Sequence, residues 1–170
     1  CILLRRSESE NGIRLVCGTV GKIVDYGIKD ANNMGAAMAP AAHATIRAHF
    51  NDLSLSPENY DLIVTGDLGA TGSAILRDLF RSDGINLQGK HLDCGCAIFD
   101  AARQDTHAGG SGCGCSAATL CGYLLKRIQK KELKRILFCA TGALLSPLSS
   151  LQGESVPGIC HAVAIHGEER

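Results

Sequence analysis

The chain has 170 residues, of which 45% are hydrophobic, and this is enough apolar material for one domain with a buried core. Lysine and arginine total 17 residues and aspartate and glutamate also total 17, so the formal net charge is zero. This balance argues against a nucleic-acid-binding protein, because such proteins carry a basic excess. The sequence contains no run of about 18 apolar residues, the length needed to span a bilayer, and no secretory signal pattern is recognised at the start.

The predicted elements begin with two short strands, 13–17 and 22–25, joined by a glycine-containing turn. From Asn33 the sequence is alanine-rich with apolar residues at helical spacing, and we expect a helix there. Pro40 is compatible with this helix only in the first turn. A buried strand is predicted over 60–65.

The rest of the chain continues to alternate strands and helices. The predicted elements are, in order, a glycine-rich loop (66–72), a helix (73–80), an irregular or strand-like stretch (90–99), a second glycine-rich loop (107–116), an amphipathic helix (117–128), a strand (135–141), a Ser/Gly/Pro-rich loop (142–158) and a last strand (159–165). This alternation predicts an α/β sheet with right-handed crossovers.

The basic residues between 126 and 135 fall at the expected end of the amphipathic helix, where cations complement the helix dipole. We interpret them as a solvated helix end, and an anionic membrane surface is the alternative.

The nine cysteines are an odd number, and most lie among apolar or small residues. They indicate a reduced, cytosolic-type protein without a disulfide scaffold. Because the first residue is Cys1 and Ile2-Leu3-Leu4 is typical of a strand entered within a fold, we expect a fragment of a longer protein.

Both glycine-rich loops lead from a strand toward a helix, where open α/β folds bind their ligands. In the loop 107–116 the glycines allow close approach of the backbone, and the N–H groups of the first helical turn favour an anion. The alternative is that the glycines only permit tight packing. The predicted ligand-binding residues of this loop are His107, Gly109, Gly110, Ser111 and Gly112.

Two carboxylates complete the candidate site. Asp67 precedes a predicted helix, so a role as N-cap explains it well, and lining the ligand site is the alternative. Glu154 lies in a Gly/Ser-rich loop, where a carboxylate is usually solvated, and the alternative is a gating or hydrogen-bonding role at the site. Both are retained as candidate ligand-binding residues.

The pairs Cys94-Gly-Cys96 and Cys113-Gly-Cys115 form a possible four-thiolate set. Their spacing is tighter than that of most structural zinc sites, so small buried cysteines are the favoured interpretation. A nucleophilic Cys113 or Cys115 at a helix N-terminus is a further alternative, because that position stabilises a thiolate. We expect no metal and no cofactor.

Four strings of sequence carry a family resemblance, namely 19–27, 30–42, 107–117 and 141–154. They resemble the stage V sporulation protein AD family, which is thiolase-like, and the resemblance covers nearly the whole chain. It implies an α/β thiolase-like fold in which residues 1–170 form the C-terminal half, a mixed five-stranded sheet with helices in αβα layers.

The resemblance also implies a function, which is to bind dipicolinic acid (pyridine-2,6-dicarboxylate) and to help its uptake into the developing spore. A small aromatic dianion suits glycine N–H groups and a histidine at a helix start. The implied partners are the N-terminal half of the same protein, other proteins of the spore dipicolinate channel and a second copy in a homodimer. The implied location is peripheral to the spore inner membrane.

The chain departs from active thiolases in three respects. The thiolase His-Pro pair would fall near Gly109-Gly110, whereas His107 stands two residues earlier. The late Cys-x-Gly pattern is missing from the loop that contains Gly153-Glu154, and the nucleophilic cysteine would belong to the other half. We therefore expect no enzymatic activity. The alternatives are an acyl-CoA condensing enzyme of the thiolase or ketoacyl synthase type and a Cys-rich metal-binding module.

Overall fold

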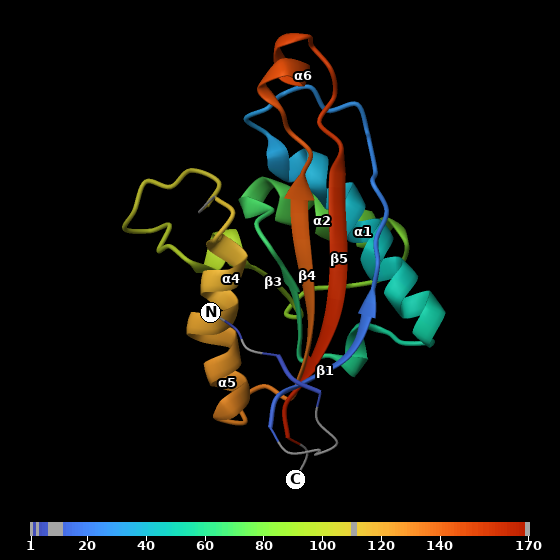
Figure 1. Ribbon diagram of the computed structural model, residues 1–170, viewed down its shortest axis with the longest axis vertical. Coiled ribbons are helices and arrows are strands. Elements are labelled where there is room, and N and C mark those ends of the chain that lie inside the picture. Colours follow the sequence, from blue (N-terminus) through green and yellow to red (C-terminus); the bar gives the residue numbers. More distant parts are fainter. Residues whose placement is uncertain (1, 3, 7–11, 110–111, 169–170) are drawn as a thin grey trace.

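A mixed five-stranded sheet forms the centre of the molecule (Figure 1). The computed structural model describes residues 2, 4–6, 12–109 and 112–168. The strands are β1 (Arg14–Thr19), β2 (Leu62–Thr65), β3 (His91–Asp93), β4 (Arg135–Ala143) and β5 (Gly158–His166). Their order is β1-β5-β4-β2-β3, and β5 runs antiparallel to β1 and β4 while β2 is parallel to β3 and β4. The predicted α/β class and mixed five-stranded sheet are confirmed.

The predicted hairpin within residues 13–25 is wrong. β1 pairs with β5 instead, and Val24 makes one antiparallel bridge to Gly158. Gly21 does not form a hairpin turn. A Cβ at this position would collide with the carbonyl oxygen of Cys160. Gly21 therefore permits close approach to β5.

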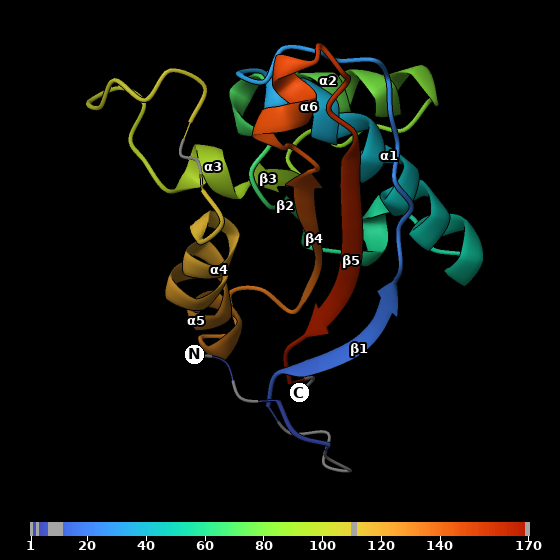
Figure 2. The same cartoon turned by 45° about the horizontal axis from the view of Figure 1, so that its top comes forward.

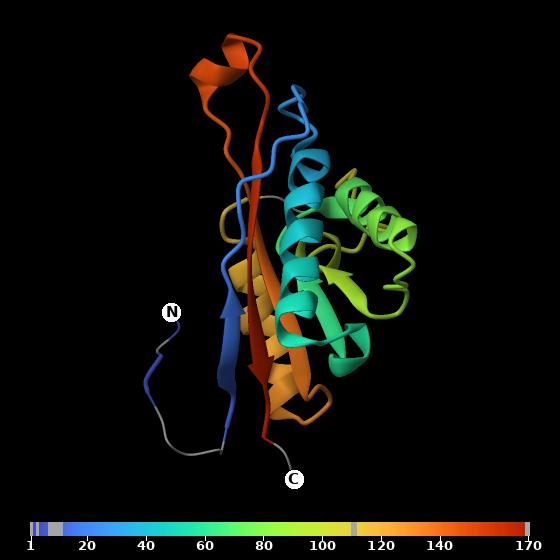
Figure 3. The ribbon, with the colours of Figure 1, turned by 90° about the vertical axis from the view of Figure 1, so that its right-hand side faces the viewer.

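Helices α1 (Met34–Leu53) and α2 (Gly69–Ser82) cover one face of the sheet (Figure 3). They cross closely at Gly35 and Gly72, where a Cβ on Gly72 would lie 2.7 Å from the carbonyl oxygen of Gly35. The largest buried side chains of this layer are Ile46, Phe50, Leu76 and Phe80. Apolar residues at helical spacing therefore form the core on this side, as predicted.

α1 begins directly after Asn33, whose side-chain oxygen accepts a hydrogen bond from the N–H of Ala36 at 3.4 Å. Pro40 therefore lies in the second turn, and the expectation that it occupies the first turn is wrong. A proline lacks the N–H that would bond to the carbonyl four residues earlier. The alanines that surround Pro40 are buried, so close packing holds the helix together at this point.

The other face carries one helical run, made of α4 (Cys115–Thr119), the π-helical turn η2 (Leu120–Leu124) and α5 (Leu125–Gln129). Its buried residues Leu120, Leu124 and Ile128 belong to a second core that includes Phe138 and Ile165 of the sheet. The layers are therefore helix, sheet and helix. The basic run starts at the end of α5, in agreement with the predicted helix end.

Three short helices occupy stretches that were predicted as turns, loops or irregular structure. They are η1 (Pro57–Asn59), α3 (Cys94–Ala97) and α6 (Pro147–Leu151). α6 stands at the tip of the β4–β5 hairpin and projects beyond the sheet (Figure 1). The hydroxyl of Ser146 caps it by accepting a hydrogen bond from the N–H of Ser149 at 3.1 Å.

The eight cysteines of the described residues are free thiols. Four of them are buried, namely Cys94, Cys115, Cys139 and Cys160. Within residues 2, 4–6, 12–109 and 112–168, no helix is both long and apolar enough to cross a bilayer.

Candidate functional site

A cavity of about 690 Å³ opens at the carboxyl ends of β2 and β4. Its wall comes from the start of α1, the loop between β2 and α2, the stretch before α4 and the end of β4. Residues of both predicted glycine-rich loops therefore meet at one cavity, although residues 69–72, predicted as loop, belong to the first turn of α2. In Figure 2 the long connection between α3 and α4, which leads into the second loop, projects from the body of the molecule.

The cavity brings together four of the seven predicted site residues, namely Asp67, His107, Gly109 and Gly112. Gly110 and Ser111 lie outside the described residues. Glu154 is exposed, follows α6 on the projecting hairpin and does not line the cavity.

Asp67 is not the N-cap of α2, contrary to the favoured expectation. The N-cap residue is Leu68, and the Asp67 carboxylate accepts a hydrogen bond from the N–H of Gly112 at 3.2 Å. The N–H of Asp67 donates to the hydroxyl of Thr141 at 3.1 Å. Asp67 thus ties the two glycine-rich loops to β4 and lines the cavity, as in the alternative interpretation.

Burial raises the pKa of the Asp67 carboxyl to about 6, the hydrogen bond from Gly112 opposes this rise, and the nearby Asp93 carboxylate adds to it. A partly buried carboxyl with a raised pKa in a cavity is typical of a functional site. The N–H of Gly112, predicted to face an anionic ligand, is therefore occupied by a carboxylate of the protein itself.

Asp93, which the sequence patterns did not single out, holds the start of α2. Its Oδ1 accepts hydrogen bonds from the N–H groups of Gly69 at 2.9 Å and Cys96 at 3.2 Å. Its Oδ2 accepts from the N–H of Leu68 at 2.8 Å and from the hydroxyl of Thr65 at 2.6 Å. A carboxylate between a short strand and a helical turn is a common capping signal, and this signal could have identified Asp93.

His91 extends this network. The hydroxyl of Thr65 has one hydrogen, which it donates to Asp93, so it accepts a hydrogen bond from Nε2 of His91 at 2.9 Å. Burial lowers the pKa of His91 to about 4, which makes the imidazole neutral at pH 7. The chain His91–Thr65–Asp93 therefore fixes the loop that carries Asp67.

The second glycine-rich loop packs tightly where it is described. Gly109 has a φ of 131°, and a Cβ there would lie 2.7 Å from the carbonyl oxygen of Gly95. The carbonyl oxygen of Ala108 accepts a hydrogen bond from the N–H of Ala70 at 2.6 Å. The side chain of His107 is 89% exposed at the cavity rim. The glycines thus serve packing and also line the cavity.

The four cysteines of the possible metal set differ in burial. Cys94 and Cys115 are buried in the core, whereas Cys96 and Cys113 are exposed. Burial raises the pKa of Cys94 to about 12 and that of Cys115 to about 11, so both stay protonated thiols near neutral pH. In the described part of the chain, no group of three or more His, Cys, Asp or Glu side chains is placed to hold a metal ion.

The family described as "Stage V sporulation protein AD" matches residues 1–166. The chain belongs to this sporulation protein family. It is 45% identical over 157 residues to stage V sporulation protein AD of Bacillus subtilis (strain 168), which covers 92% of this chain and 46% of that protein. This member of the stage V sporulation protein AD family therefore spans about half the length of that relative.

Two solved structures share the fold of this stage V sporulation protein AD family member. One is 3-oxoacyl-[acyl-carrier-protein] synthase III from Aquifex aeolicus VF5, with a TM-score of 0.50 and 12% identity over 94% of this chain and 55% of that chain. The other is AbyA1, a tetronic acid condensing enzyme, with a TM-score of 0.53 and 10% identity over 96% of this chain and 51% of that chain. The predicted thiolase-like fold is confirmed, and at such low identity these likenesses concern the fold alone.

Proposed function

We propose that the protein to which this chain contributes the C-terminal half binds dipicolinic acid and helps its uptake into the developing spore. The observation that carries the proposal is the convergence of both glycine-rich loops and the starts of α1 and α2 on one cavity of about 690 Å³. Sites for small molecules typically measure about 300–1,000 Å³. Membership of a sporulation protein family supports the same function.

The side chains of the cavity wall suit a ligand that is a flat ring carrying two carboxylate groups. Met34 and Met38 supply apolar surface for a ring, and the hydroxyls of Thr106, Ser116 and Thr141 are hydrogen-bond donors for carboxylate oxygens. Thr141 already accepts a hydrogen bond from the N–H of Asp67, so its own hydroxyl hydrogen is available to a ligand. The start of α1 adds partial positive charge.

We also propose that this site binds its ligand without catalysis. Thiolase-type chemistry needs a reactive thiolate. Burial strongly raises the pKa values of Cys94 and Cys115, neither of which lines the cavity, and Cys113 is the described cysteine at its wall. Because the fold is shared with a synthase and a condensing enzyme, acyl-CoA condensation is the second candidate function. It predicts an acyl-thioester on a cysteine of the full-length protein after incubation with acyl-CoA, and mass spectrometry detects that adduct.

The proposed function is tested by isothermal calorimetry of the full-length protein with dipicolinate. We expect saturable binding, and we expect Thr141→Val to weaken it by about 3- to 10-fold, the effect of losing one hydrogen bond. The matched control is Thr71→Val, which changes an exposed threonine of α2 outside the cavity. Absence of binding, or equal loss in both variants, would contradict a dipicolinate site at this cavity.

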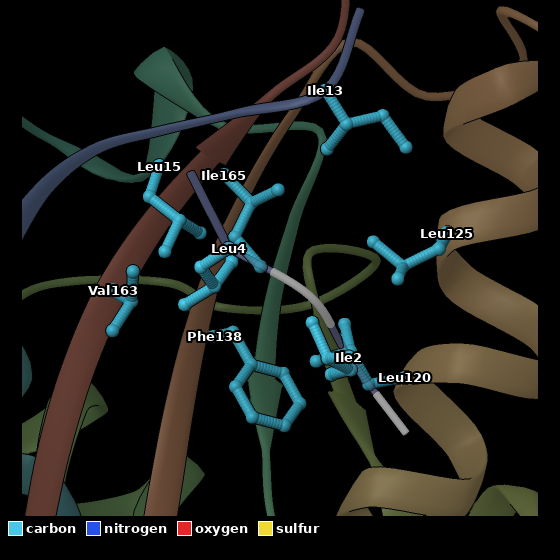
Figure 4. Close-up of a pocket in the computed structure, with 9 residues that line it drawn as sticks. All are labelled: Ile2, Leu4, Ile13, Leu15, Leu120, Leu125, Phe138, Val163 and Ile165. Carbon is cyan, nitrogen blue, oxygen red and sulfur yellow. The ribbon is translucent and has the colours of Figure 1, made fainter. Parts of the chain in front are cut away.

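The N-terminal half of the same protein is the proposed partner of an apolar groove of about 320 Å³ (Figure 4). The groove lies on the sheet face that carries η2 and α5, between Leu120 and Leu125 on one side and Val163 and Ile165 on the other. Exposed apolar surface of this kind marks an interface, and the matched relative is about twice as long as this chain. A homodimer, contacts with other proteins of the dipicolinate channel and attachment to the spore inner membrane are further parts of the proposal.

A further inference from the structure

The cavity that is proposed to hold a dianion contains the carboxylate of Asp67, and its described lining residues include no lysine or arginine. Among the described lining residues, Asp67, His107 and Cys113 are the side chains that can change charge, and none is lysine or arginine. A dianion that enters this cavity therefore meets the negative charge of Asp67. Like charges in close contact strongly oppose joint ionisation.

The groups around Asp67 reinforce this conflict. On the side of β3 stands the buried carboxylate of Asp93, and on the sides of α3 and α4 stand the thiols of Cys94 and Cys115, whose pKa values the Asp67 charge helps to raise. The hydrogen bond from the N–H of Gly112 stabilises the ionised form. Burial and Asp93 outweigh it, and the pKa of Asp67 rises to about 6.

We propose that Asp67 binds the ligand as a neutral carboxylic acid, and that the full-length protein takes up one proton from solvent for each dicarboxylate that enters the cavity. This inference rests on the proposed function. The proton is added to Asp67, whose O–H then donates a hydrogen bond to a ligand carboxylate, while the other oxygen keeps the hydrogen bond from Gly112. The proton leaves a buffer acid or a hydronium ion, whose bond to it breaks as the O–H of Asp67 forms, and no other covalent bond changes.

The proposal predicts how affinity changes with pH. Simple carboxylic acids titrate near pH 4, so the ligand stays a dianion between pH 7 and 9 while the free protein loses the proton of Asp67. The dissociation constant should therefore rise about tenfold for each pH unit in this range. Asp67→Asn mimics the neutral acid, because its amide can donate to the ligand and its oxygen can accept from Gly112. This variant should bind with little dependence on pH, and more tightly than the wild type above pH 7.

The experiment is calorimetry of dipicolinate with the full-length protein, in phosphate and in Tris buffer at each pH. The difference between the two apparent enthalpies gives the number of protons exchanged per ligand. We expect uptake of about 0.9 proton at pH 7 in the wild type, from a carboxyl that titrates near pH 6 in the free protein, and near zero in Asp67→Asn. His107→Gln removes the other protonatable group at the rim and should retain the proton uptake, because the proposal adds the proton to Asp67. Asp78→Asn removes an exposed carboxylate of α2 outside the cavity and should behave as the wild type.

The outcomes separate this inference from the proposed function. Binding without proton uptake, or binding that requires a divalent cation in place of the proton, overturns the role of Asp67 and leaves dipicolinate binding intact. Absence of binding in the wild type and in Asp67→Asn at every pH overturns both. Tight binding by Asp67→Asn at pH 8, where the wild type binds weakly, supports both.

Discussion

One buried carboxylate organises the residues that position the site. Asp93 is 4% exposed and accepts four hydrogen bonds, which connect β2, the start of α2 and the start of α3. Because it holds the N–H groups that begin α2, a ligand at the cavity does not find these donors available. The N–H groups at the start of α2 are thus used within the fold, so the proposed ligand would depend on the hydroxyls of the cavity wall, on α1 and on the protonated Asp67.

Replacement of Asp93 by alanine should destabilise the protein by about 3–5 kcal/mol, since it leaves several buried donors without an acceptor. Urea unfolding of the full-length protein measures this change. Asp78→Ala is the control, because Asp78 is an exposed carboxylate paired with Arg81 and should change stability by less than about 0.5 kcal/mol. A loss below about 1 kcal/mol in Asp93→Ala would show that water replaces the carboxylate.

Residue types at the site were predictable, but their contacts were not. The glycine pattern indicated two loops that lead from a strand toward a helix, where open α/β folds bind ligands, and residues of both loops line the same cavity. The partner of Asp67 is Gly112, which lies 45 residues later, and no local pattern encodes that pairing. The local cap that Asp93 makes with Cys96 was detectable, but its bonds to Thr65 and Leu68 span 28 and 25 residues and no local pattern encodes them.

At the scale of elements, the close crossing of α1 and α2 depends on Gly35 and Gly72, which have no side chains to separate the two helices. A Cβ on Gly72 would lie 2.7 Å from the carbonyl oxygen of Gly35 and 2.9 Å from its Cα, both of them backbone atoms that cannot move independently. Close contact at this crossing also sets the mouth of the cavity, since Gly35 and Gly69 line it.

Gly72→Ala should therefore destabilise the full-length protein by about 1–3 kcal/mol, although alanine is the better helix former by about 1 kcal/mol. Gly122→Ala is the matched control, because Gly122 lies in the helical run on the opposite face and a Cβ there meets open space. It should stabilise the protein by up to about 1 kcal/mol. Thermal unfolding compares the two, and equal effects would contradict the close crossing.

The sequence predicted regular elements well and irregular ones poorly, for a physical reason. Helical spacing identified α1 and the run from Cys115 to Gln129, because their buried faces repeat along the chain. α3 is four residues long and depends on the cap from Asp93, so it has no periodicity to detect. The error at residues 13–25 has a similar origin. Gly21 resembles a turn residue in the sequence, but a glycine is needed there because a Cβ would collide with the carbonyl oxygen of Cys160 on β5.

At the scale of the whole molecule, the apolar groove makes a prediction about assembly. Leu15 lines the groove and is 52% exposed, whereas its neighbour Val16 is 51% exposed and does not line it. If the N-terminal half packs here, a charge at position 15 is buried in an apolar contact, which is costly.

Leu15→Glu should therefore prevent this chain from joining a separately expressed N-terminal half, while Val16→Glu should leave the joining intact. Co-expression followed by affinity capture and size-exclusion chromatography measures the amount of complex. The unjoined wild-type chain should bind a hydrophobic dye and self-associate, because the groove is uncovered. Equal yields of complex from both variants would place the interface elsewhere.

The two edge strands of the sheet, β1 and β3, also affect how copies of the protein associate at high concentration. β3 is three residues long, and β1 carries a bulge between Leu15 and Cys17. Short or bulged edges disrupt the regular row of N–H and C=O groups to which a foreign strand could add. In the described part of the chain, neither edge of the sheet is a long, regular template for such growth. High concentrations of this protein should therefore favour association through side-chain surfaces, which is reversible, over fibrils built by continuing the sheet from one molecule to the next.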